Sequence, residues 1–342
     1  MSKDLKDKTP AELEQIVTPY GGKKYLAGCI FSFIHSKGAG DISQISPLGK
    51  AVRAELVEQG FFISKLDFSR RLTDPDGTVK YSFDLGDGDI IESVILLDER
   101  RRTLCVSTQA GCAMNCAFCA TAKLKLRRNL TAAEIVDQVY TAENESGRIT
   151  NVVYMGMGEP LANYDAVLKS VRILNDPAGR NIGIRHLTVS TCGIAPAIKK
   201  LAGEDIHPRL AISLNATTDE LRTKLMPVNA KYPIRVLLDA VEDYQFRARQ
   251  RVTFEYVMIK GLNDSLQDAE RLVRLLRRLR CNVNLIEYNP HPGCKFKGSG
   301  VERIERFCEA LGEAGIETTI RFKMGQTIFA ACGQLGANRQ RR

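Results

Sequence analysis

The chain has 342 residues, of which 44% are hydrophobic and 26% are charged, and it carries a formal net charge of +9. This composition is ordinary for a globular protein with a sizeable core, and it excludes a disordered or fibrous chain. No apolar run is long enough to cross a bilayer and the first residues contain no signal-peptide core, so we expect a cytoplasmic protein without a membrane partner.

The first segment, residues 1–97, predicts a small accessory domain of the α+β class. It opens with three short helical patterns, over residues 10–17, 23–35 and 47–59. From residue 64 onward the pattern changes to alternating and apolar runs separated by Gly- and Asp-rich turns, which is typical of strands. We therefore expect a compact appendage in front of a larger domain.

Residues 98–336 show a regular alternation of strand and helix patterns. The predicted strands cover residues 104–108, 151–155, 187–191, 210–214, 253–258, 283–286 and 318–322. Amphipathic helical patterns lie between them, and one opens with a capping box at Thr131. Such alternation implies parallel strands with crossover helices, so the sequence predicts an α/β fold with a partial (β/α) barrel. Residues 337–342 are expected to form a basic tail.

A Cys-x3-Cys-x2-Cys run, made by Cys112, Cys116 and Cys119, follows directly after the first predicted barrel strand. Three closely spaced thiolates can hold three irons of a [4Fe–4S] cluster, whose usual complement is four cysteines. The fourth iron is then open to a substrate or cofactor. A zinc knuckle or three buried cysteines are the alternatives, but zinc sites usually add a second ligand pair downstream, and none follows here. The sequence therefore predicts one cluster per chain.

The segment Met155-Gly-Met-Gly-Glu-Pro160 lies at the end of the second predicted barrel strand. Gly158 lets the backbone approach a ligand closely, and Glu159 offers an acceptor for an ammonium group. Alone, the pattern is equally typical of a tight turn, but beside an open iron it predicts the amine site of S-adenosylmethionine (SAM). Polar segments at later strand ends, which in many proteins only cap helices, are further candidates for SAM binding. They are Ser190, Ser213-Leu214-Asn215 and Asn289.

Two cysteines outside the cluster motif are distinctive. Cys105 lies inside a predicted strand seven residues before the motif, and Cys332 lies in the small-residue loop Ala330-Ala-Cys-Gly-Gln-Leu335. Small neighbours leave the Cys332 thiol accessible, which suits a nucleophile. The remaining cysteines are expected to be buried small hydrophobes. They are Cys29, Cys192, Cys281, Cys294 and Cys308.

Glu92 is an acid within the apolar run of residues 90–97. It is either the solvent-facing residue of a strand or a base whose pKa is raised by desolvation. Basic residues cluster at 100–102, 123–128 and 277–280. The second cluster follows the cysteine loop and predicts a contact with a phosphate backbone, whereas the third lies on a helical pattern and predicts a solvated face.

Taken together, these motifs resemble the radical SAM rRNA methyltransferases, the RlmN and Cfr family. Four segments carry the resemblance in the same order: Leu104-Cys-Val-Ser-Thr-Gln-Ala-Gly-Cys112, Arg128-Asn-Leu-Thr-Ala-Ala-Glu134, Met155-Gly-Met-Gly-Glu-Pro-Leu161 and Ala330-Ala-Cys-Gly-Gln-Leu335. The resemblance implies a partial barrel of the radical SAM type and an N-terminal domain that docks RNA. It also implies SAM-binding positions at Gly158, Glu159, Ser190, Ser213, Leu214, Asn215 and Asn289.

The resemblance further implies a covalent route that consumes two SAM molecules per methylation. Neither C2 nor C8 of adenine is nucleophilic toward a sulfonium methyl group, so polar methyl transfer is blocked. Cys332 instead takes a methyl group from one SAM, and a radical made from the second removes a hydrogen from it before the carbon joins the ring. Glu92 matches the family's proton acceptor. Cys105 matches the thiol that resolves the protein–RNA adduct, leaving a disulfide with Cys332.

We therefore expect an RlmN-type enzyme that forms 2-methyladenosine in 23S rRNA and in tRNA beside the anticodon. It would act as a monomer with an electron donor such as flavodoxin. Cfr-type methylation at C8 shares every motif and stays open. The basic patches would also suffice for a non-enzymatic iron–sulfur RNA-binding module. A radical enzyme acting on a peptide or small metabolite is the last alternative, against which the pair Cys105 and Cys332 argues.

Overall fold

The computed structural model describes residues 2–20, 24–98, 101–321 and 323–337. Four sequence predictions fall partly outside these ranges. They are the start of the second helix at Lys23, Arg100 of the first basic cluster, the end of the last strand at Phe322 and the basic tail beyond Ala337.

A ten-stranded sheet organises the described part of the chain, in the order β1-β2-β3-β4-β7-β8-β9-β10-β11-β12. From β4 onward each neighbouring pair is parallel. These strands are β4 (Arg101–Cys105), β7 (Asn151–Tyr154), β8 (Leu187–Thr191), β9 (Arg209–Ser213), β10 (Val252–Met258), β11 (Cys281–Glu287) and β12 (Glu317–Arg321). Each predicted barrel strand overlaps one of them, and the predicted partial (β/α) barrel is confirmed.

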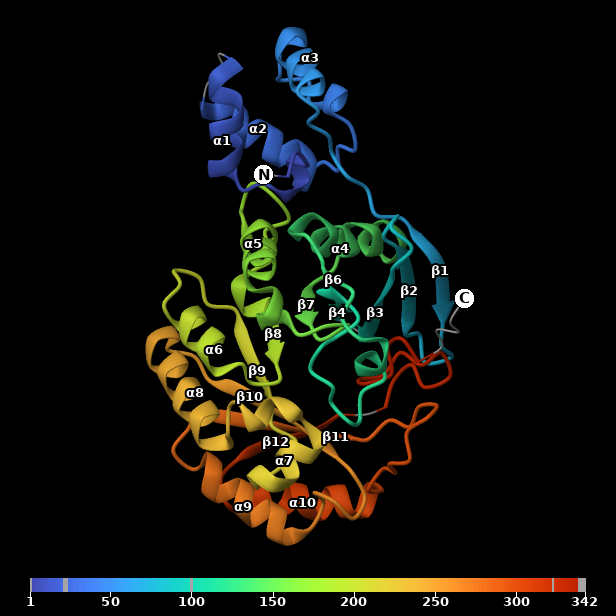
Figure 1. Ribbon diagram of the computed structural model, residues 1–342, viewed down its shortest axis with the longest axis vertical. Coiled ribbons are helices and arrows are strands. Elements are labelled where there is room, and N and C mark those ends of the chain that lie inside the picture. The colour runs from blue at the N-terminus through green and yellow to red at the C-terminus, as the bar shows by residue number, and fades with distance from the viewer. Residues whose placement is uncertain (1, 21–23, 99–100, 322, 338–342) are drawn as a thin grey trace.

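Three antiparallel strands extend this sheet at the β4 edge. They are β1 (Phe68–Thr73), β2 (Val79–Asp84) and β3 (Ile90–Asp98). The sheet is therefore continuous across residue 97, where the sequence predicts the end of the accessory domain. The N-terminal helices form a separate group at the top of Figure 1, beyond α4 and α5. They are α1 (Pro10–Val17), α2 (Lys24–His35) and α3 (Lys50–Glu58).

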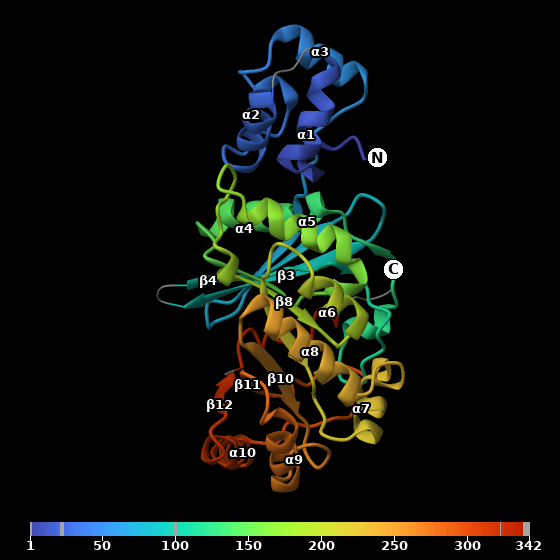
Figure 2. The same ribbon diagram turned by 90° about the vertical axis from the view of Figure 1, so that its left-hand side faces the viewer.

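Helices that connect the parallel strands cover one face of the sheet (Figures 1 and 2). They are α4 (Ala132–Ser146), α5 (Tyr164–Asn175), α6 (Ala195–Ala202), α8 (Ile234–Ala248), α9 (Leu266–Leu276) and α10 (Val301–Glu313). The predicted capping box opens α4, since the Thr131 side chain accepts from the Glu134 amide and the Glu134 side chain binds the Thr131 amide. In the described residues no helix combines the length and apolarity needed to span a bilayer.

Side chains alternate between the two faces of the parallel strands, and the faces differ in chemistry. The outer face is apolar and fully buried against the helices, as at Leu104, Val152, Ile212, Phe254 and Leu285. The strand registers place a polar set on the inner face. It comprises Cys105, Ser190, Ser213, Glu255, Asn284 and Arg321. The interior of the partial barrel is therefore the polar side of the sheet.

A buried ion pair fixes the N-terminal segment to the barrel. Lys6 Nζ lies 2.6 Å from Asp137 Oδ1 on α4, and the two side chains are 7% and 5% exposed. The other Asp137 oxygen accepts the amide of Leu66 at 3.0 Å. Burial raises the pKa of Asp137 to about 6, although Lys6 acts in the opposite direction. The carboxylate thus depends on Lys6 to remain charged in this position.

Replacing Lys6 by Met should cost about 3–5 kcal/mol of unfolding free energy near neutral pH, because a buried carboxylate loses its partner. The deficit should shrink as the pH falls, since the raised pKa of Asp137 means that the folded state takes up the proton more readily than the unfolded chain. Urea unfolding at several pH values measures both effects. Lys65→Met, which removes an exposed pair with Asp67, is the matched control and should change little. Equal losses in the two variants would contradict the account.

Candidate active site

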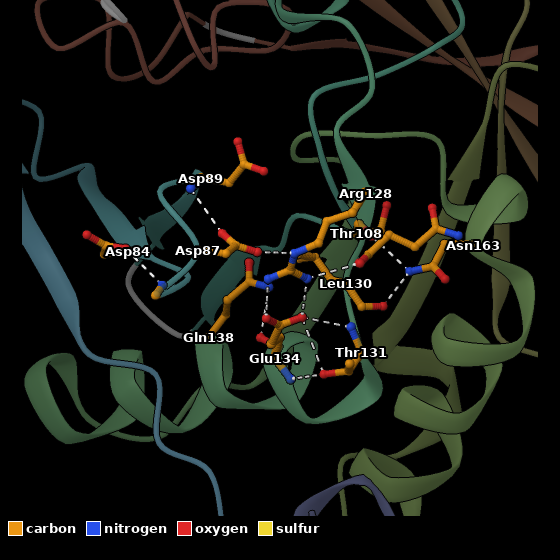
Figure 3. Close-up of polar contacts among 12 residues, drawn as sticks. Asp84, Asp87, Asp89, Thr108, Arg128, Leu130, Thr131, Glu134, Gln138 and Asn163 are labelled. Atoms are coloured by element: carbon orange, nitrogen blue, oxygen red, sulfur yellow. Dashed lines mark hydrogen bonds and ion pairs between the residues drawn. The ribbon is translucent and has the colours of Figure 1, made fainter. Parts of the chain in front are cut away.

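The three motif cysteines lie in a loop, residues 111–127, whose two ends are held together. Short strands β5 (Gln109–Ala110) and β6 (Arg128–Asn129) pair antiparallel on either side of it. Asn163 Nδ2 donates to the carbonyls of Thr108 and Leu130, at 2.8 Å each, and so links the two ends (Figure 3). Contacts within the protein therefore close the loop at its base.

Arg128 is the second element that closes this base (Figure 3). Its guanidinium donates to both carboxylate oxygens of Glu134, at 2.9 and 2.7 Å, and also to Asp87. The hydrogen bonds to Glu134 are the largest cause of the raised pKa of Arg128. The sequence predicted that the basic cluster 123–128 contacts phosphate. For Arg128 the geometry argues against this, because Glu134 and Asp87 engage its guanidinium. A phosphate contact by the rest of the cluster stays a prediction.

The thiols of the loop affect one another electrostatically. Cys112 is buried, whereas Cys116 and Cys119 are partly exposed. Burial, with a smaller contribution from Cys119, raises the pKa of Cys112 to about 12. Burial also raises the pKa of Cys116, and Cys119 and Cys112 add to this shift. The three groups are thus close together.

The donor set fits an iron–sulfur cluster. Across the described ranges, no group of three or more His, Cys, Asp and Glu side chains is arranged to hold a metal ion. The fit therefore rests on residue type and spacing. Iron–sulfur clusters are held by cysteines, and the loop offers three of them on one short segment.

The glycines before Glu159 are required for packing. A Cβ on Gly156 would lie 2.6 Å from the carbonyl oxygen of Val106, and one on Gly158 would lie 2.6 Å from the Cβ of Gln109. Gly158 also has φ +98°, a conformation that favours glycine. The tight-turn interpretation of this segment is therefore correct, and the turn presses Glu159 against the residues that precede the cysteine loop.

Glu159 is buried and held by backbone donors. Its Oε1 accepts the amide of Leu161 at 3.0 Å and its Oε2 accepts the amide of Cys192 at 2.8 Å. Burial raises its pKa, partly offset by the Cys192 amide. The carboxylate also raises the pKa values of Cys112 and Cys116, so it lies near the cysteine loop. The side chains of Thr191 and Cys192 also hydrogen-bond to this carboxylate.

The other predicted SAM residues lie at strand ends with different surroundings. Ser190 and Ser213 are half-buried on the inner face. Leu214 is fully buried. Asn215 accepts the amide of Val257 at 2.8 Å, so its side chain joins two neighbouring strand ends. Asn289 Nδ2 donates to the carbonyl of Cys332 at 3.2 Å. The two asparagines therefore have structural roles, and cofactor binding by this set stays a prediction.

The loop that carries Cys332 is hydrogen-bonded to the cysteine loop. One hydrogen bond, 2.8 Å long, runs from the Ala120 amide to the Gly333 carbonyl. A second bond runs from Thr121 Oγ1 to the Leu335 carbonyl, also at 2.8 Å. Cys332 is exposed. Desolvation by neighbouring protein atoms nevertheless raises the pKa of its thiol, while Arg321 lowers it.

Cys105 completes this set of thiols. Burial is the largest cause of its raised pKa, and Cys332 is the next largest. Cys119 in turn contributes to the raised pKa of Cys332. The thiols of Cys105, Cys332 and Cys119 therefore lie within electrostatic range of one another. All the cysteines are free thiols.

Glu92 points inward, so its interpretation as a solvent-facing strand residue is wrong. The registers place Lys80, Glu92 and Cys105 on one face of the sheet. Lys80 Nζ lies 3.3 Å from Glu92 Oε1, with side chains 2% and 9% exposed. Glu92 Oε2 accepts the amide of Gly336 at 2.8 Å, and Lys80 donates to the carbonyl of Phe329 at 3.2 Å. The ion pair thus holds both ends of the Cys332 loop.

Sequence reasoning missed Lys80, Glu255 and Arg321. Glu255 is buried in β10, accepts from Asn284 Nδ2 at 2.9 Å and leaves Oε2 without a hydrogen-bond partner. Burial raises its pKa, and Arg321 lowers it. An acid within an apolar strand, the signal that singled out Glu92, was also present at Glu255. Lys80 and Arg321 carried no comparable signal.

Two other predictions have mixed outcomes. Of the cysteines expected to be buried, Cys192 is buried, whereas the others are half-buried. They are Cys29, Cys281, Cys294 and Cys308. The arginines of the third basic cluster, residues 277–280, are exposed, as a solvated face requires.

Replacing Lys80 by Met should destabilise the protein by about 3–5 kcal/mol, because Glu92 then stays buried without its cation. The double variant Lys80→Met/Glu92→Gln should recover a large part of this loss, since neither charge remains. Urea unfolding of both variants measures the difference. Arg247→Met, which breaks an exposed pair with Asp243, should cost at most about 1 kcal/mol. A double variant no more stable than the single one would exclude an unpaired charge as the cause.

Comparison with known proteins agrees with this site. The model of the radical SAM superfamily matches residues 106–276. The dual-specificity RNA methyltransferase RlmN of Syntrophobacter fumaroxidans is 44% identical over 336 residues, which cover 97% of this chain and 98% of the relative. The probable dual-specificity RNA methyltransferase RlmN of Moorella thermoacetica is 46% identical over 345 residues, with 97% and 96% covered.

A solved structure leads to the same family. The crystal structure of a radical SAM methyltransferase from Sphaerobacter thermophilus aligns with a TM-score of 0.91 and 46% identity, and the alignment covers 98% of this chain and 99% of that one. The chain therefore belongs to the radical SAM superfamily and, within it, to the RlmN family of methyltransferases.

Proposed function

We propose that this protein forms 2-methyladenosine in RNA, both in 23S rRNA at the peptidyl transferase centre and in tRNA beside the anticodon. Its relatives named RlmN are dual-specificity RNA methyltransferases, and these two targets are the ones that the sequence resemblance implies. The observation that carries the proposal is the meeting of Cys105, Cys332 and the cysteine loop at one mouth of the barrel.

Cys112, Cys116 and Cys119 would hold a [4Fe–4S] cluster, which when bound supplies the electron that cleaves SAM to a radical. Glu159 would offer its buried carboxylate to the SAM ammonium group as a charged hydrogen-bond acceptor. Gly158, Ser190, Ser213, Leu214, Asn215 and Asn289 would line the rest of the SAM site. Two SAM molecules are consumed for each methyl group delivered.

Cys332 acts as the methyl carrier. Its thiolate attacks the sulfonium methyl of the first SAM, so a sulfur–carbon bond forms on Cys332 as the one in SAM breaks and S-adenosylhomocysteine leaves. The cation of Arg321 favours this thiolate, in line with its lowering of the Cys332 pKa. The carried methyl group then loses a hydrogen atom to the radical, and its carbon joins C2 of the adenine ring.

Glu92 and Cys105 release the product. Glu92 would accept the C2 proton of the adduct, and the electron lost in the same step would be taken up by the cluster that Cys112, Cys116 and Cys119 would hold. Cys105 then attacks the sulfur of Cys332, so that a disulfide forms while the sulfur–carbon bond breaks, and the freed carbon takes up a proton to become the methyl group. The strand registers support these roles, because they make Glu92 and Cys105 diagonal neighbours on one face of the sheet. Such neighbours are about 7–8 Å apart.

We further propose that the protein acts as a cytoplasmic monomer, with a low-potential electron donor such as flavodoxin. The N-terminal helices and β1–β3 would dock the RNA. These proposals rest on the resemblance and on the net charge of +9, which favours a polyanionic partner.

Mass spectrometry of rRNA and tRNA digests from a complemented knockout strain tests the product. We expect 2-methyladenosine to return in both RNAs. If 8-methyladenosine returned as the sole product, the protein would have Cfr-type specificity. An anaerobic protein that binds RNA but never forms 5′-deoxyadenosine from SAM would instead be a binding module.

Replacing Cys332 by Ala should leave the iron and sulfide content unchanged and abolish RNA methylation, because the methyl carrier is gone. Replacing Cys105 by Ala should accumulate protein crosslinked to RNA on denaturing gels, because the adduct is not resolved. Cys308→Ala, a half-buried cysteine on the outer helix α10, should behave as wild type. Normal methylation by Cys332→Ala, or normal turnover without crosslinks by Cys105→Ala, would refute the respective role.

A further inference from the structure

Arg222 is a fully buried cation without a close anionic partner. It lies on the short helix α7 (Asp219–Leu225) and has no accessible surface. Across the described ranges, no carboxylate lies within ion-pair distance of its guanidinium. Burial lowers the pKa of Arg222, and Asp219 opposes this from farther away. A buried charge of this kind is costly unless another charge compensates it.

Every nitrogen of the Arg222 guanidinium donates a hydrogen bond, and all of the acceptors are neutral. Nε donates to the carbonyl of Leu214 at 3.0 Å, and Nη1 donates to Asn229 Oδ1 at 3.0 Å. Nη2 donates to the carbonyls of Cys192 at 2.7 Å and Ser213 at 3.2 Å. These contacts tie together the ends of β8 and β9. Because the acceptors are neutral, these bonds account for a hydrogen-bond donor at this position, but they do not account for its positive charge.

The helix that carries Arg222 touches the cysteine loop. The carbonyl of Leu225, at the end of α7, accepts the amide of Ala117 at 2.9 Å, and Ala117 directly follows Cys116. Cys116 packs against the same small apolar cluster that contains Leu225 and Cys192. Arg222 donates to the carbonyl of Cys192, whose side chain belongs to this cluster. Arg222 and its helix are therefore packed against the cysteine loop at Cys116.

We propose that Arg222 is the buried counter-cation of the iron–sulfur cluster and that its charge raises the reduction potential of that cluster. The inference rests on the proposed function only in that a cluster is held by Cys112, Cys116 and Cys119. Three thiolates make such a cluster anionic, and one added electron makes it more so. A fixed cation in a dry interior stabilises the reduced form more than the oxidised form.

The test is a redox titration, followed by electron paramagnetic resonance, of the anaerobically reconstituted full-length protein. Arg222→Met should shift the reduction equilibrium at least tenfold toward the oxidised cluster, about 59 mV for a one-electron couple. Arg222→Lys, which keeps the charge, should restore most of the shift. Arg271→Met, which removes an arginine paired with Asp268 on α9, controls for net charge and should leave the potential unchanged. An unchanged potential in Arg222→Met would overturn the proposal.

A second measurement tests the proposal in case Arg222→Met folds poorly. Arg222→Gln keeps a polar side chain but no charge. Loading the cluster should raise the melting temperature of the wild type by more than that of Arg222→Gln. In the wild type the negative charge of the cluster compensates the buried cation of Arg222, whereas Arg222→Gln has no cation to compensate. Equal gains would contradict the role of Arg222. A wild-type protein that shows no [4Fe–4S] signal would instead refute the cluster, and with it the proposed function.

Discussion

Side-chain alternation along the parallel strands is the constraint on which the active site depends. Leu104 and Cys105 are neighbours in the chain, yet one is buried against the outer helices while the other faces the interior beside Cys332. A register slip of one residue would exchange the two faces and bury the polar set among the helices. The apolar outer face therefore fixes the register, and the register in turn assembles the chemistry from strands that are far apart in the sequence.

The loops at the mouth of the barrel are held by buried polar contacts. Asn163 and Arg128 close the base of the cysteine loop, and the ion pair of Lys80 with Glu92 holds the Cys332 loop. Asn163 and the pair of Lys80 with Glu92 join segments that are distant in sequence, and they are buried, where hydrogen bonds and charges act more strongly. Arg128 is partly exposed. The two loops then bond directly to each other through Ala120.

Much of the fold follows from local patterns. The strand of residues 187–191 and the capping box at Thr131 appear where short-range periodicity and hydrogen bonding predict them, because these signals need no distant partner. The roles of Arg128 and Lys80 depend on Glu134, Asp87 and Glu92, and no spacing rule pairs these residues. Arg222 was missed because its burial is a tertiary property. Residue type revealed the cysteines, whereas the charges around them required the assembled structure.

The central claim is that the sheet register and the Cys332 loop bring Cys105 and Cys332 together on the inner face. Mild oxidation of the cluster-loaded protein with diamide, followed by tryptic peptide mapping by mass spectrometry, tests it directly. The account predicts a disulfide between Cys105 and Cys332, because each thiol lies within electrostatic range of the other. Pairing of Cys332 with another cysteine such as Cys294, while Cys105 stays reduced, would contradict it.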